Sequence, residues 1–164
     1  MKKVLKKIGL ALLILFVIIQ FFRPAKNINT VDATKVVAAV FTMPDNVGKI
    51  LQKSCYDCHS NNTAYPWYNN FQPVMWYLNN HVNEGKREIN FDEFATYKLR
   101  RQFHKMEEII EQVEEGEMPL YSYTLIHSDA KLSKEDKEVL IAWAKANMDS
   151  MKAKYPIDSL IKKK

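Results

Sequence analysis

The two cysteines of this chain lie three positions apart and are followed directly by a histidine, in the sequence Cys55-Tyr56-Asp57-Cys58-His59. Two thiols at this spacing can each form a thioether with one vinyl group of a haem, and the adjacent histidine can then bind the iron. The pattern therefore predicts one covalent haem c, attached through Cys55 and Cys58, with His59 as an iron ligand. The rest of the chain would have to fold around this group.

Other uses of the cysteine pair fit the sequence less well. A structural zinc site needs four ligands, and without a second cysteine pair the remaining ones would have to come from His81, His104 and His127. A thioredoxin-like dithiol would lie beside a βαβ unit, and no such pattern is visible. A disulfide that closes so short a loop would stabilise the fold very little. A tethered interaction module with a disulfide and no haem is kept as the third alternative.

The charge of the chain is concentrated at its N-terminus. The formal net charge is +5, but Lys2, Lys3, Lys6, Lys7 and Arg23 are five of the 24 basic residues, which leaves 19 basic against 19 acidic ones. A balanced domain of this kind has no basic, aromatic-interleaved face to neutralise phosphates, so we expect no nucleic-acid partner.

Residues 8–22 form an almost unbroken apolar run, interrupted by Gly9 and Gln20. As a helix this run spans roughly 22 Å, which is shorter than the roughly 30 Å hydrocarbon core of a bilayer. Val4 and Leu5 would extend the apolar helix, with the charged ends of Lys6 and Lys7 reaching the membrane surface. Because no A-x-A-like cleavage site follows, the run predicts an uncleaved anchor rather than a signal peptide. We expect a single-pass protein of the inner membrane, with its C-terminal domain in the periplasm.

The remainder of the sequence predicts an all-α domain. We divide the chain into an anchor (1–23), a tether with an ambiguous segment (24–43), a haem-binding domain (44–154) and a basic tail (155–164). Helices are expected over about 44–53, from 73 to Gly85, from 90 or 92 to Gly116, and from the N-cap Ser133 to about 152. The first three have apolar faces with Val47, Ile50, Leu51; Val74, Tyr77, Leu78, His81; and Leu99, Phe103, Met106, Ile110, Val113. The predicted buried side of the last helix carries Val139, Leu140, Trp143 and Ala146.

The sixth ligand of the iron decides what such a protein can do, because a filled position favours electron transfer and an open one permits peroxide or gas chemistry. Met118 is the favoured ligand, since it lies in an irregular loop before Pro119, and His81 is its rival. The other candidates are His127, His104, Met75 and Met106. The aromatic cluster with Tyr65 and Trp67 is expected to cover one haem face, although ordinary core packing would also explain it.

Two resemblances extend this interpretation. A short helix leading into C-x-x-C-H, a late Met-Pro loop, a Leu-Ser-x-x-Asp helix start and an aromatic-bearing last helix resemble class I cytochromes c. This resemblance implies that Met118 is the distal ligand and that Val47 and Leu51 pack against Leu140 and Trp143. The chain lacks the Gly-Pro pair that follows the motif in that family and accepts a hydrogen bond from the other ring N–H of the histidine. A carbonyl near Pro66 or Pro73 is expected to accept it instead.

The chain more closely resembles a family of membrane-anchored haem-binding domains common in Bacteroidetes. The similarity covers roughly residues 24–153 and rests on Ser-Cys-Tyr-Asp-Cys-His-Ser-Asn, Tyr-Pro-Trp-Tyr, His-Val-Asn-Glu-Gly, Asn-Phe and Glu-Met-Pro-Leu. We therefore expect a monohaem carrier of single electrons between redox proteins, without enzymatic activity or a small-molecule substrate. The alternative is a five-coordinate haem protein with peroxidase-like or gas-sensing activity.

Overall fold

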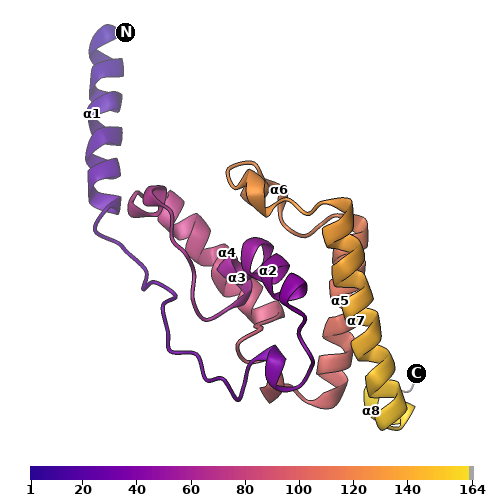
Figure 1. Ribbon diagram of the computed structural model, residues 1–164. Coiled ribbons are helices and arrows are strands. Elements are labelled where there is room, and N and C mark those ends of the chain that lie inside the picture. Colours follow the sequence, from indigo (N-terminus) through magenta and orange to yellow (C-terminus); the bar gives the residue numbers. More distant parts are fainter. Residues whose placement is uncertain (163–164) are drawn as a thin grey trace.

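A computed structural model describes residues 1–162, which fold into helices joined by loops (Figure 1). The predicted all-α class is therefore confirmed, and the β contact in this part of the chain is an isolated bridge between Ile28 and Asn62. In chain order, with η for a 3-10 helix, the elements are α1 Lys2–Ile19, η1 Val37–Ala39, α2 Asp45–Ser54, α3 Tyr56–His59, η2 Trp67–Asn70, α4 Val74–Glu88, η3 Phe94–Thr96, α5 Leu99–Glu115, α6 Tyr121–Thr124, η4 Ser128–Ala130, α7 Lys134–Lys154 and α8 Ile157–Leu160.

The predicted N-terminal membrane anchor is wrong. Helix α1 points away from the other helices (Figure 1), but no helix within residues 1–162 has both the length and the apolar character needed to cross a membrane. The helix ends at Ile19, before the end of the apolar run, and four of its 18 residues are lysines. Its uncharged part, residues 8–19, spans only about 18 Å, compared with roughly 30 Å of bilayer hydrocarbon. Without this anchor there is no support for the predicted single-pass protein of the inner membrane with a periplasmic domain.

The segment after α1 is bound to the domain rather than loosely tethered. The side chain of Asn27 is buried and donates to the carbonyl of Ser60, 2.9 Å away, and to the hydroxyl of Thr63. Its own amide oxygen accepts from the ammonium group of Lys86, 2.6 Å away. These bonds hold the segment against the loop that follows the cysteine motif.

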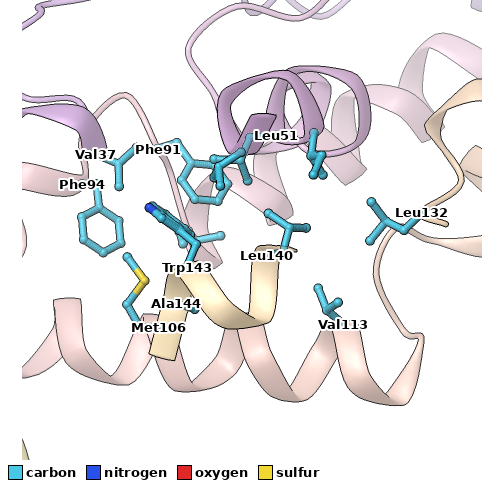
Figure 2. Packing of buried hydrophobic residues seen from close by; sticks show 13 residues of the cluster. Val37, Leu51, Phe91, Phe94, Met106, Val113, Leu132, Leu140, Trp143 and Ala144 are labelled. Carbon is cyan, nitrogen blue, oxygen red and sulfur yellow. The ribbon is translucent and has the colours of Figure 1, made fainter. Parts of the chain in front are cut away.

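The main hydrophobic core lies where α2 meets the pair formed by α5 and α7, which run side by side (Figure 1). Figure 2 shows Leu51 of α2 together with Leu140 and Trp143 of α7, and Val47 belongs to the same buried cluster. The packing that the cytochrome c resemblance implied for these four residues is therefore confirmed. Ala146 is exposed, so its predicted burial is wrong.

Two predicted helix ends are wrong, and both lie close to the cysteine motif. Helix α4 continues through Gly85 to Glu88. Helix α5 begins at Leu99 instead of 90 or 92, because Asn90 and Asp92 are buried and hydrogen bonded to Asn61, each at 2.8 Å. The predicted end of α5 is confirmed, since its C-cap, Gly116, has the left-handed backbone angle (φ 79°) that favours glycine.

Candidate haem site

The cysteine motif forms the junction of α2 and α3 and lies beside two neighbouring cavities. Cys55 is both the C-cap of α2, directly after its last residue Ser54, and the N-cap of α3. The cavities have volumes of about 330 and 380 Å³, and Cys55, His59, Glu88 and Met118 line both of them. Cavities of about 300–1,000 Å³ are typical of cofactor and ligand sites.

His59 is held in the orientation and the protonation state that an iron ligand needs. Its Nδ1 lies 2.9 Å from the carbonyl oxygen of Gly85 and 3.0 Å from that of Ile89. Since carbonyl oxygens only accept, Nδ1 carries the hydrogen, and Nε2 is left with a free lone pair. Burial lowers the pKa of His59, although the bonds to Ile89 and Gly85 oppose this shift. The imidazole is therefore neutral near pH 7, the form that binds metals.

The carbonyls that accept from His59 belong to Gly85 in α4 and to Ile89, the C-cap of α4, so the expectation that a carbonyl near Pro66 or Pro73 would do so is wrong. Gly85 makes this arrangement possible, because a Cβ atom at its position would lie 2.8 Å from the carbonyl oxygen of Cys58. We predicted this glycine only as a helix end. A glycine inside an otherwise helical pattern was the available signal for a close backbone approach.

Both cysteines have free, protonated thiols. Burial raises the pKa of Cys55 to about 12, with the neighbouring Cys58 as a smaller cause. Burial likewise raises the pKa of Cys58 to about 11, with the charge of Asp57 contributing. Within residues 1–162 no group of three or more His, Cys, Asp or Glu residues is placed to hold a metal ion. Neither the zinc site nor the disulfide finds support in this arrangement.

The candidate sixth ligands are spread over the molecule. Met118 lines both cavities that His59 lines, whereas His81 lines only the second of them, with its Nδ1 bonded to the carbonyl of Tyr77. Met75 and Met106 are buried outside these cavities. His104 lies on the surface between Glu107 and Glu108, and His127 bonds to the hydroxyl of Tyr68 at 2.7 Å.

Tyr65 and Trp67 line a third cavity, of about 460 Å³, which includes Cys58 but not His59. The Tyr65 hydroxyl accepts a hydrogen bond from the backbone N–H of Asn27, and the Trp67 side chain is largely exposed. The structure thus places both aromatic residues in the wall of a cavity that shares Cys58 with the second cavity of His59.

Within the described part of the chain, four charged residues line the first cavity, Glu88, Lys105, Glu108 and Glu111, and none of them was predicted there. Lys105 of α5 is buried and contacts Glu108 of the same helix, and its Nζ lies 3.5 Å from Oε2 of Glu88. A lysine next to an apolar stripe gives no sequence signal of burial.

The geometry fits a haem: a neutral imidazole with a free Nε2, two thiols and two adjoining cavities meet at one place. Consistent with this, residues 14–146 match the family of the haem-binding domain. The chain belongs to that family of haem proteins. No curated protein and no solved structure matches the chain.

Proposed function

We propose that this protein is a monohaem c-type cytochrome that carries one electron at a time between redox partner proteins. Cys55 and Cys58 would attach the haem through two thioether bonds, and His59 and Met118 would hold its iron. The bound haem supplies the one-electron change of its iron. The protein supplies the attachment, the ligands and the exclusion of water from the cavity.

The observation that carries this proposal is the double hydrogen bond of His59 to the carbonyls of Gly85 and Ile89. Outer hydrogen bonds of this kind fix the tautomer of a ligating histidine and raise its basicity. The first acceptor lies within α4 and the second is its C-cap, and α4 packs against α3. The cysteines therefore stand beside an imidazole that is already oriented for the iron.

Met118 supports electron transfer over small-molecule chemistry. It lines both cavities that His59 lines, in the loop between α5 and α6. A thioether on the sixth position would close the iron to peroxide and gases and raise its reduction potential.

Covalent attachment is tested by co-expression with the cytochrome c maturation machinery. We expect haem staining at the mass of the denatured chain, and loss of that stain in the Cys55→Ala/Cys58→Ala variant. A known c-type cytochrome matured in the same host is the control for the machinery. A colourless product beside a stained control would contradict the proposal.

The sixth position is tested by carbon monoxide. We expect the reduced wild-type protein to take up carbon monoxide slowly or not at all, because Met118 occupies the iron. Rapid uptake would instead support a five-coordinate haem with peroxidase-like or gas-sensing activity.

A further inference from the structure

Lys105 is a buried cation in the wall of the cavity that also contains Cys55 and His59. Only 8% of its side chain is exposed, and it contacts the carboxylates of Glu88 and Glu108. An ammonium group in such a place needs a negative partner, because burial of an unpaired charge is strongly unfavourable.

The two glutamates are far more exposed than the lysine. Their side chains are 63% exposed for Glu88 and 35% exposed for Glu108. Each carboxylate can turn toward water with little loss, since ion pairs with exposed partners contribute little to stability. The buried ammonium group cannot leave, so it can accept another carboxylate in place of one of them.

Because glutamates surround this cavity, a haem propionate bound in it would need a cation as its partner. Among the described residues that line it, three are glutamates (Glu88, Glu108 and Glu111), and Lys105 is the one lysine or arginine. A haem carries two propionate carboxylates. Like charges at close range repel, so an unpaired propionate in this cavity would be destabilised.

We propose that Lys105 binds a propionate carboxylate of the haem, which replaces one glutamate partner. The exchange puts one carboxylate in place of another, so the ammonium group stays paired throughout. It also orients the porphyrin, with the vinyl edge at the cysteines of α2–α3 and the propionate edge toward α5. This inference rests on the part of the proposed function that places the haem beside His59, and it does not depend on the thioether bonds.

The test measures how strongly the protein prefers haem over haem dimethyl ester, in which both propionates are uncharged. Full-length protein with Cys55→Ala/Cys58→Ala keeps binding reversible, and each compound is titrated by its Soret absorbance. We expect this background to prefer haem, and Lys105→Gln to reduce the preference about tenfold or more, as loss of a charge-assisted hydrogen bond would. Lys105→Arg should retain most of the preference. Lys145→Gln is the matched control, because Lys145 is an exposed lysine that pairs with Glu114 on the outside of the molecule.

A second variant, Glu108→Gln, covers the case in which Lys105→Gln does not fold. It removes a competing carboxylate, so the preference for haem over the ester should rise. An unchanged preference in Lys105→Gln would overturn the proposal, and so would an equal loss of affinity for both compounds, which indicates a purely structural lysine. His59→Ala tests the iron-ligand role of His59 separately from the propionate role of Lys105. It should weaken the binding of haem and of the ester alike, and unchanged binding would contradict the ligand role of His59.

Discussion

Nδ1 of His59 lies 2.9 Å from the carbonyl oxygen of Gly85, a residue 26 positions later in the chain. This bond joins the cysteine motif on α3 to the interior of α4. It requires the two backbones to approach so closely that a Cβ on residue 85 would meet the carbonyl oxygen of Cys58 at 2.8 Å and its Cβ at 3.1 Å. One helix crossing therefore sets both the position of the second cysteine and the direction of the histidine.

Gly85→Ala should destabilise the protein although alanine is the better helix former. The new methyl group meets main-chain atoms of Cys58, which cannot move aside as a flexible side chain could. We expect the free energy of unfolding to fall by about 1–3 kcal/mol, the usual range for overpacking. Because the displaced α4 also carries the carbonyl partners of His59, haem affinity should fall as well. Chemical denaturation and a haem titration measure the two effects.

Gly48→Ala in α2 is the matched control. Its Cβ would have ordinary contacts, at 3.8 Å or more, with the side chain of Met43. Here the gain in helix propensity is unopposed, so stability should rise by roughly 0.5–1 kcal/mol. Equal changes in the free energy of unfolding in the two variants would show that the close approach at Gly85 does not affect stability.

Met118→Ala tests the distal ligand. We expect the ferric protein to lose the weak near-infrared band of a methionine–iron bond, and the ferrous protein to take up carbon monoxide rapidly. His81→Ala is the companion variant and should leave the band in place, because His81 lines only one of the two cavities. If the spectrum is insensitive to Met118→Ala and changes in His81→Ala, the histidine is the ligand.

The sequence predicted the parts of the fold that follow local rules. The helix that ends at the cysteine motif, the glycine stop at Gly116 and the N-cap Ser133 all agree with the structure. Each depends on residues within a few positions of one another, so composition and spacing suffice. The contact of Val47 and Leu51 with α7 came from a resemblance and could not have been obtained from spacing alone.

The site depends on contacts between distant segments, and there the sequence was insufficient. The acceptor for His59 lies on α4, because Gly85 permits a close approach that its position in a helix pattern did not reveal. Lys105 is buried and pairs with Glu88, which comes from a different helix. The prediction of a membrane anchor was wrong for a different reason: the apolar composition extends to Phe22, but the helix ends at Ile19.

Asn27→Ala tests whether the segment after α1 is an integral part of the domain. The side chain of Asn27 bonds to Ser60, Thr63 and Lys86, and its loss removes all three bonds. We expect the free energy of unfolding to fall by about 1–3 kcal/mol, the usual penalty for unsatisfied buried groups. Thr30→Ala, at an exposed position nearby, should change it little. Equal denaturation curves for the two variants would indicate a loose tether.

Asp136→Asn tests the acid stability of α7. Asp136 forms a capping box with Ser133, and its carboxylate also lies 3.0 Å from Nζ of Lys53 on α2. The hydrogen bond from the backbone of Ser133, followed by the bond and charge of Lys53, lowers the pKa of Asp136 below its usual value of 3.8. A lowered pKa means that the folded state binds this proton less readily than the unfolded state does.

The stabilising contribution of Asp136 is therefore complete above pH 3.8 and is lost as the pH falls through the lower pKa of the folded state. At pH 7, Asp136→Asn should lower the free energy of unfolding by about 1 kcal/mol, as loss of a helix cap does. Between about pH 5 and pH 2 its stability should fall less steeply than that of the wild type, because the linked proton is gone. Thermal unfolding across this range measures both effects, with Asp149→Asn on the exposed side of the same helix as the control. Parallel curves for wild type and Asp136→Asn would show that the bond to Lys53 and the capping box do not contribute to acid stability.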